Sequence, residues 1–275
     1  MSTFRPVLAV LSLAIGAVIS GNASAQIYTN GPLSTGATAE VGTAAPAGTT
    51  WSELQHDTGN TTVANGSAGI SGSTQVATQF RLADDFTVPV GQNWTITAVE
   101  TFAYKTGSAA TPSPFTAATL QIWSGRPGDV GSTVLCGDTT TNVLASSTDS
   151  LMFRLFNSVV PNTSNPPGTT RRIWRNRLTV PAACSGAMFF TPGTYWLDFA
   201  TTDSAAGAHF YPNVTVAGSR TPPGTPNSRQ FVSTAGVWAD VLDTGTPVTP
   251  PSIPQEFPFL LFGTLPVSLQ SFSVD

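Results

Sequence analysis

Short runs in which apolar and polar residues alternate recur along this chain of 275 residues. Residues 118–124 (ATLQIWS) and 194–200 (TYWLDFA) are typical, because nearly every second side chain is apolar. A period of two matches a β-strand with one buried face, and no segment shows sustained apolar residues at helical spacing. The other runs that predict strands are 51–56, 77–83, 94–104, 151–156, 172–180, 208–216, 229–233, 237–242, 257–262 and 267–273.

Turn-forming residues separate these runs, as in 89–91 (PVG), 125–128 (GRPG) and 165–168 (NPPG). Charged residues make up 9% of the chain, against about 25% in an average domain. Ser, Thr, Asn, Gly and Pro supply the polarity instead, and this composition favours strands joined by turns. The sequence therefore predicts an all-β fold, a single antiparallel β-sandwich of jelly-roll type.

The first 25 residues have the features of a secretory signal peptide. Arg5 supplies a positive start, residues 7–19 form an apolar run that is short for a membrane span, and residues 23–25 (ASA) resemble a cleavage site. We expect the chain to be exported, extracellular or periplasmic, to begin at Gln26 and to have no membrane span after cleavage. An uncleaved membrane anchor is the alternative.

The rest of the chain predicts one domain. Residues 26–50 are rich in Gly, Ala and Thr and indicate a flexible N-terminal arm. Strand signals continue on both sides of each Pro-rich stretch, so we expect a β-sandwich domain over 51–263 and an edge strand or tail over 264–275. The net charge of −4 argues against nucleic acid as a partner.

Cys136 and Cys184 are the two cysteines of the chain. In an exported protein a lone pair predicts a disulfide. A reactive or metal-binding thiol is the alternative, but neither cysteine has a nearby His or a second Cys.

Several segments occur in an order that resembles a known group of proteins. They include 45–62 (APAGTTWSELQHDTGNTT), 81–96 (RLADDFTVPVGQNWTI), 114–134 (PFTAATLQIWSGRPGDVGSTV) and 192–200 (PGTYWLDFA). Together they are similar to exported bacterial proteins built around an ADDFxVPxGxxWxI module. The resemblance covers most of the chain after residue 25. It implies a secreted bacterial β-sandwich and no particular activity.

Asp84 and Asp85 are adjacent carboxylates in this module, and three roles are open to them. They could cap the turn that follows the strand. They could bind calcium with backbone carbonyls and Asp138, because Ca²⁺ prefers oxygen ligands. They could act as a catalytic pair, but neighbours on a strand point to opposite faces, which does not suit two groups that must act on one bond.

A second group of candidates lies on the polar sides of the predicted strands. Aromatic rings beside planar hydrogen-bonding groups are suited to bind a sugar, because the rings stack on C–H surfaces and the polar groups bind hydroxyls. The alternative is that both sheet faces are buried and the tryptophans belong to the core. The candidate ligand-binding residues are Trp123, Arg154, Arg175, Trp196 and Asp198.

No catalytic constellation is evident in the sequence. There is no G-x-S-x-G elbow, and His56 and His209 alone do not make a zinc site. We therefore predict a non-catalytic secreted module that binds polysaccharide or cell-envelope glycan, with calcium as the one cofactor suggested. A glycan hydrolase using two of Glu100, Asp84, Asp85 and Asp198 is one alternative. A purely structural envelope or matrix component is the other.

Glu100 alternates with apolar residues, which would place it in the core unless a β-bulge turns it outward. The arginines of residues 171–177 (RRIWRNR) are divided between two faces by the alternation. We expect them to pair with acidic residues across strands or to face solvent.

Overall fold

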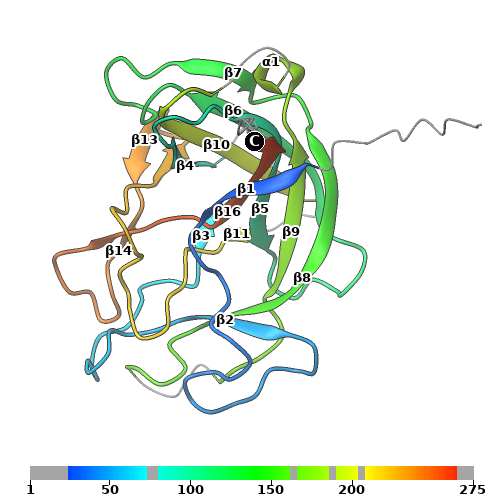
Figure 1. Ribbon diagram of the computed structural model, residues 1–275. Helices are drawn as coiled ribbons and strands as arrows, with labels where there is room; N and C mark the ends of the chain where they lie inside the picture. The colour runs from blue at the N-terminus through cyan, green and yellow to red at the C-terminus, as the bar shows by residue number, and fades with distance from the viewer. Residues whose placement is uncertain (1–23, 73–79, 162–165, 186–189, 204–207, 265–275) are drawn as a thin grey trace, which may run out of the picture.

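The computed structural model describes residues 24–72, 80–161, 166–185, 190–203 and 208–264. Within these ranges the regular secondary structure is almost entirely β-strand, as predicted, with one short helix, α1 (Ala182–Ser185) (Figure 1). The strands are β1 (Ala25–Asn30), β2 (Thr50–Leu54), β3 (Ile70–Ser71), β4 (Arg81–Val88), β5 (Thr95–Tyr104), β6 (Phe115–Trp123), β7 (Val134–Asp138), β8 (Leu144–Phe156), β9 (Arg172–Thr179), β10 (Gly193–Asp203), β11 (Phe210–Tyr211), β12 (Arg229–Val232), β13 (Val237–Asp240), β14 (Leu242–Asp243), β15 (Ile253–Pro254) and β16 (Phe259–Thr264).

The strands form two large sheets. One is a curled eight-stranded sheet in the order β1-β16-β5-β9-β8-β2, with β11 and β3 attached beside β5. The other has six strands in the order β13-β12-β4-β10-β6-β7, and β14 pairs separately with β15. The pairing is antiparallel except between β2 and β8, which run parallel. That exception differs from the expected antiparallel sandwich, and the long stretch of chain between the two strands permits it.

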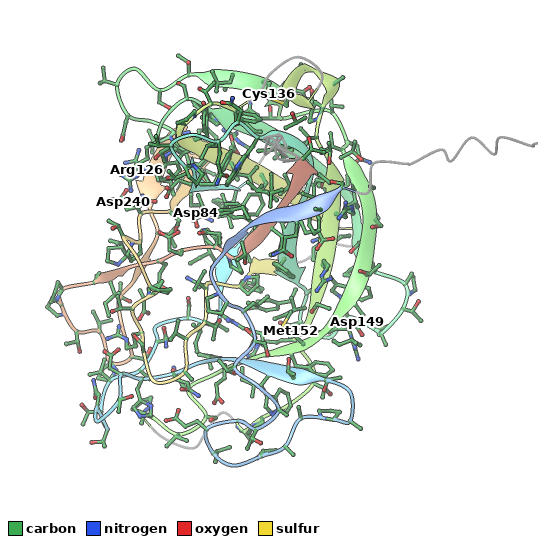
Figure 2. The ribbon with its side chains drawn as sticks, in the orientation of Figure 1. Asp84, Arg126, Cys136, Asp149, Met152 and Asp240 are labelled. Atoms are coloured by element: carbon green, nitrogen blue, oxygen red, sulfur yellow. A yellow bond between two sulfur atoms is a disulfide. The ribbon has the colours of Figure 1, made fainter. Side chains whose placement is uncertain are left out.

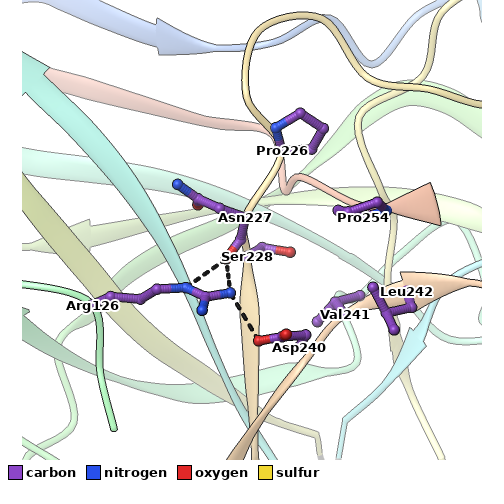
Figure 3. Close-up of a pocket in the computed structure, with 8 residues that line it drawn as sticks. All are labelled: Arg126, Pro226, Asn227, Ser228, Asp240, Val241, Leu242 and Pro254. Atoms are coloured by element: carbon purple, nitrogen blue, oxygen red, sulfur yellow. Dashed lines mark hydrogen bonds and ion pairs between the residues drawn. The ribbon is translucent and has the colours of Figure 1, made fainter. Parts of the chain in front are cut away.

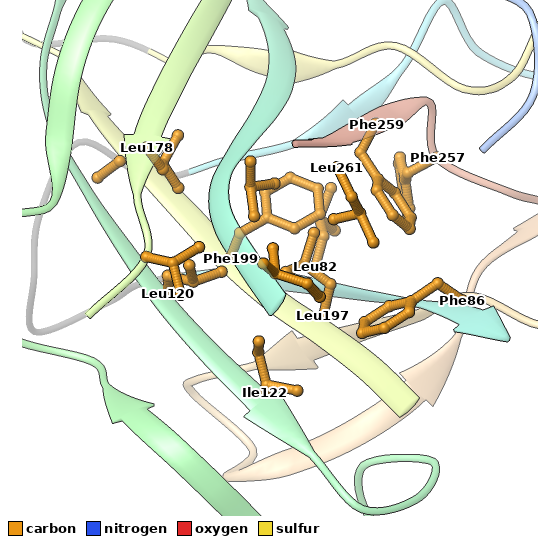
Figure 4. Close-up of a cluster of buried hydrophobic side chains, with 14 of the residues drawn as sticks. Leu82, Phe86, Leu120, Ile122, Leu178, Leu197, Phe199, Phe257, Phe259 and Leu261 are labelled. Carbon is orange, nitrogen blue, oxygen red and sulfur yellow. The ribbon is translucent and has the colours of Figure 1, made fainter. Parts of the chain in front are cut away.

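The alternation predicted from the sequence forms the core between the sheets (Figure 4). Leu82 and Phe86 on β4 and Leu197 and Phe199 on β10 project from the six-stranded sheet, and all four are almost fully buried. They belong to one cluster with residues of β5, β9 and β16 on the eight-stranded sheet. Removal of this apolar surface from water is the main stabilising contribution to the fold.

A bulge in the pairing of β5 with β16 determines the position of Glu100. The register shifts between Phe262 and Gly263, so that Val99 faces the core and Glu100 faces the other side of the sheet. There Arg177 Nη1 lies 2.9 Å and Arg175 Nε lies 3.6 Å from the Glu100 carboxylate. The bulge hypothesis and the expected cross-strand pairing of these arginines are confirmed.

The ends of the chain differ in part from the prediction. Residues 25–30 form β1, which pairs with β16, so this part of the expected flexible arm is a sheet strand. It is a strand because Ile27 and Tyr28 pack against the core. Residues 1–23, 77–79 and 265–275 lie outside the described residues, with most of the predicted signal peptide and the predicted strand 267–273.

The predicted disulfide is present. Cys136 on β7 is bonded to Cys184 on α1, with the two Cα atoms 5.4 Å apart. The bond therefore links the edge of the six-stranded sheet to the segment that follows β9 of the other sheet. None of the helical structure in the described part of the chain is long and apolar enough to cross a membrane.

Candidate functional site

The outer face of the six-stranded sheet brings together three of the predicted ligand-binding residues. Trp196 on β10 lies opposite Trp123 on β6, and Asp198 lies two residues further along β10 on the same face. Trp238 on β13 packs against Trp123 in a T-shaped arrangement, with ring centroids 6.2 Å apart. We call Trp123, Trp196 and Trp238 the tryptophan face.

Asp198 is the polar centre of this face. Arg81 Nε donates to the Asp198 carboxylate at 3.1 Å, and Trp123 Nε1 donates at 3.2 Å. The Arg81 guanidinium also lies over the rings of Phe231 and Trp238, 4.2 and 5.2 Å from their centroids. Burial raises the pKa of Asp198 to about 6, although Arg81 and Trp123 act in the opposite direction.

We expect Asp198 to make stability depend on pH. Its folded pKa of about 6 exceeds the value of about 3.9 in an unfolded chain. The folded state therefore binds this proton more tightly, and the associated stability is lost as pH rises through 6. Asp198→Asn should reduce the fall in unfolding free energy between pH 4 and pH 7 by about 2–3 kcal/mol. Urea titrations of both proteins measure this, and parallel pH profiles would contradict it.

Three of the predicted ligand-binding residues are placed differently from the expectation. Trp196 is 4% exposed, because Arg126 lies over its ring at 5.7 Å, so it is not an open stacking platform. Arg154 is fully buried; its prediction as a surface residue is wrong, because both faces of β8 are covered from Met152 to Leu155. Arg175 lies on the eight-stranded sheet beside Glu100.

Figure 3 shows a hollow of about 260 Å³. It lies beside the tryptophan face, because Arg126 lines it and also lies over the Trp196 ring. Arg126 spans it, donating from Nε and Nη2 to the carbonyl of Asn227 and from Nη2 to Asp240 at 2.8 Å. The Asp240 side chain is half-exposed. We call this the arginine hollow. Its lining residues are Arg126, Pro226, Asn227, Ser228, Asp240, Val241, Leu242 and Pro254.

The two adjacent carboxylates meet a third one at the edge of β4. Strand β12 pairs with β4 only as far as Ala83, which leaves the next residues of β4 without a neighbour strand on that side. Glu256, just before β16, lies there, and carboxylate oxygens of Asp84, Asp85 and Glu256 all lie within 4.8 Å of one another. We call these three the acidic cluster, and Asp84 is labelled in Figure 2.

Hydrogen bonds hold the acidic cluster in place. Asp84 Oδ2 accepts from the backbone N–H of Phe257 at 2.6 Å, and Asp84 Oδ1 accepts from the N–H of Asp85. Glu256 Oε1 accepts from the N–H of Asn227 at 2.6 Å. Asn30 Nδ2 lies within 3.3 Å of Asp84, Glu256 and the carbonyl of Phe257. Asp84 thus joins β4 to the segment before β16, a longer connection than the turn cap expected from the sequence.

The electrostatics of the cluster oppose ionisation of all three groups. Burial, and then the charge of Glu256, raise the pKa of Asp84 well above its usual value. Burial also raises the pKa of Glu256, against hydrogen bonds from Asp84, Asn227 and Asn30. For Asp85 burial raises the pKa, while Asn227 and the charge of Arg126 lower it.

The acidic cluster borders a second hollow, of about 280 Å³. We call it the acidic hollow, and Asn227 lines both hollows. The remaining calcium candidate, Asp138, lies elsewhere on β7, where its carboxylate caps the turn through Thr140 and Thr141. The lining residues of the acidic hollow are Tyr28, Asn30, Asp85, Pro223, Gly224, Thr225, Asn227 and Glu256.

Sequence reasoning did not identify Glu256, Asn30 or Asn227. Each comes from a segment far from Asp84 in the chain, and none is part of a recognisable ligand-spacing motif. Both histidines contact neighbouring polar side chains of the fold and lie outside the two hollows. His56 pairs with Glu40 at 3.2 Å, and His209 is buried beside Thr201, Tyr211 and Asp203.

Comparisons with known proteins found no matching family model, no matching curated protein and no matching solved structure. The two hollows and the tryptophan face are therefore the features of the chain that bear on its function.

Proposed function

We propose that this chain is an exported, non-catalytic β-sandwich module of jelly-roll type that binds a polysaccharide or cell-envelope glycan. The arginine hollow and the adjoining tryptophan face are the proposed site. The observation that carries the proposal is the adjacency of the partly exposed Trp123 and Trp238 rings to paired Arg and Asp groups on one sheet face, beside a hollow. Rings stack on sugar C–H surfaces, and planar charged groups bind hydroxyls.

The size and exposure of the site agree with this class of ligand. A hollow of about 260 Å³ is close to the lower end of small-molecule sites, roughly 300 Å³. It suits one sugar unit of a longer chain. Asp240 retains exposed carboxylate surface although it pairs with Arg126 and Arg229. It can therefore accept a hydrogen bond from a hydroxyl of the ligand. The disulfide and the features of the first 25 residues support export.

The arrangement of carboxylates favours binding over hydrolysis. Of the four carboxylates considered for catalysis, Asp84 and Asp85 come together, whereas Glu100 is held by two arginines on the other sheet. Glycosidases place two carboxyl groups about 5–9.5 Å apart across the bond to be cleaved. Asp84 is fully buried, so it does not face a substrate, and one of its oxygens lies within 4.8 Å of an Asp85 oxygen.

We expect selective depletion of the purified protein from solution by one or a few members of a panel of insoluble polysaccharides and cell-envelope preparations. Trp238→Ala and Asp240→Asn should each weaken this binding by roughly tenfold, because each removes a contact at the site. Phe156→Ala is the matched control. Phe156 is also partly exposed beside an arginine, Arg171, but lies on the eight-stranded sheet.

Two results would contradict the proposal. Failure of every polysaccharide and envelope preparation to deplete the protein would favour the structural-component alternative. Release of new reducing ends from a depleting polysaccharide would show hydrolysis and replace the binding module by an enzyme.

A further inference from the structure

The acidic hollow lies beside a group of carboxylates that the proposed glycan site does not use. Asp85 and Glu256 line it, and a carboxylate oxygen of Asp84 lies within 4.8 Å of theirs. Asp84 and Glu256 are more than nine-tenths buried. Within the described ranges, no ion pair with Arg, Lys or His involves any of the three. Carboxylates held this close in a partly buried site repel one another unless a proton or a cation compensates them.

The neighbouring Asn227 amide has an oxygen atom without a partner among the described residues. The Asn227 side chain donates a hydrogen bond to Asp85, while its buried Oδ1 atom has no hydrogen-bond partner in the part of the chain that the structure describes. Asn30 Nδ2 lies 3.0 Å from Asp84 Oδ2, 3.3 Å from Glu256 Oε2 and 2.9 Å from the carbonyl of Phe257. Asp84 Oδ2 also accepts from the N–H of Phe257, so the two hydrogens of the Asn30 amide can serve Glu256 and the carbonyl of Phe257.

We propose that the acidic cluster binds a calcium ion at the acidic hollow, with Asn227 Oδ1 as a further ligand. Calcium takes six to eight oxygen ligands and tolerates irregular geometry, and water can enter the hollow to complete the set. Zinc is disfavoured because no Cys or His lines the hollow among the described residues. Magnesium is disfavoured because it requires near-ideal octahedral geometry. This inference is independent of the glycan proposal, which concerns the neighbouring hollow.

The bound ion would join three parts of the chain. Asp84 and Asp85 belong to β4 of the six-stranded sheet, and Glu256 precedes β16 of the eight-stranded sheet. Asn227 lies in the loop that leads into β12. Calcium binding would thus stabilise the contact between the two sheets and fix the loop shared by both hollows.

Isothermal titration of the EDTA-treated protein with CaCl₂ tests the proposal at constant ionic strength. We expect one site per chain, a Kd below about 1 mM and much weaker binding of Mg²⁺. At a calcium concentration 100-fold above the Kd, Tm should rise by about 5 °C. Asp85→Asn and Glu256→Gln should each weaken binding at least about tenfold. Asp138→Asn is the matched control, because Asp138 is an exposed carboxylate away from the cluster, and its Kd should match that of the wild type.

Direct titration of the wild type keeps the test decisive even where a variant does not fold. Absence of calcium binding to the wild type would overturn the proposal and leave a shared proton as the compensating charge. Binding that persists unchanged in folded Asp85→Asn and Glu256→Gln proteins would also overturn it, because the ion would then lie elsewhere. Terbium luminescence, displaced by calcium and lost in the same two variants, provides a second readout.

Discussion

Opening the Cys136–Cys184 disulfide is expected to lower the free energy of unfolding by about 4 kcal/mol. The bond joins residues 48 positions apart, and a loop of this length accounts for about 4 kcal/mol in the chain-entropy model. The enclosed segment contains β8 and β9, which are neighbouring strands of the eight-stranded sheet. Urea unfolding of the oxidised and reduced wild-type protein measures the difference.

The double variant Cys136→Ala/Cys184→Ala is the control for this experiment. Cys184 is fully buried and Cys136 nearly so, so removal of the sulfur atoms adds a packing cost to the loss of the bond. The variant should therefore be at least as unstable as the reduced wild type. A change below about 1 kcal/mol on reduction would contradict a stabilising role of the bond.

Arg154→Ala is expected to destabilise the fold by about 3–5 kcal/mol, the second-largest effect. Arg154 is completely buried, and burial lowers its pKa to about 10. Its guanidinium donates to the carbonyl of Ala68 at 2.6 Å and to the hydroxyls of Ser52 and Thr215. Alanine would leave the carbonyl of Ala68 without this donor and open a cavity, and both effects are costly in a core.

Arg154→Met separates the two effects. Methionine fills most of the same volume and removes a buried charge that has no carboxylate partner among the described residues. Ser52 and Thr215 lie 3.4 Å apart and can hydrogen-bond to each other. We therefore expect Arg154→Met to cost less than half as much as Arg154→Ala in urea unfolding. Equal costs would show that the guanidinium hydrogen bonds, rather than the volume, stabilise this region.

Much of the fold could be predicted from local pattern. The runs at 94–104 and 194–200 became β5 and β10, because alternation with a buried face is a local property of a strand. Strand β7 (Val134–Asp138) was not predicted, because it is a short edge strand with little alternation. The bulge that moves Glu100 outward was visible as a hypothesis, since Val99 breaks the strict pattern.

The candidate site was less accessible to such reasoning. Trp196 and Asp198 share one face of β10, as their spacing of two residues requires, but the position of Trp123 beside Trp196 depends on the pairing of β6 with β10. The burial of Trp196 was one of two alternatives, and the strand pattern could not decide between them, because the loop that carries Arg126 covers the ring from outside the strand. The partnership of Asp84 with Glu256 was not foreseeable, since it depends on where β12 stops pairing with β4.

The sequence by itself determined which residues form strands, which side chains share a strand face, and that the two cysteines could pair. These are consequences of a two-residue period, turn chemistry and cysteine count. The tertiary structure alone decided which faces are covered, that Arg154 is buried, and that Asp84, Asp85 and Glu256 converge. The reason is physical: burial and electrostatic coupling arise between segments that are distant in the chain, and their strength depends on separation in space.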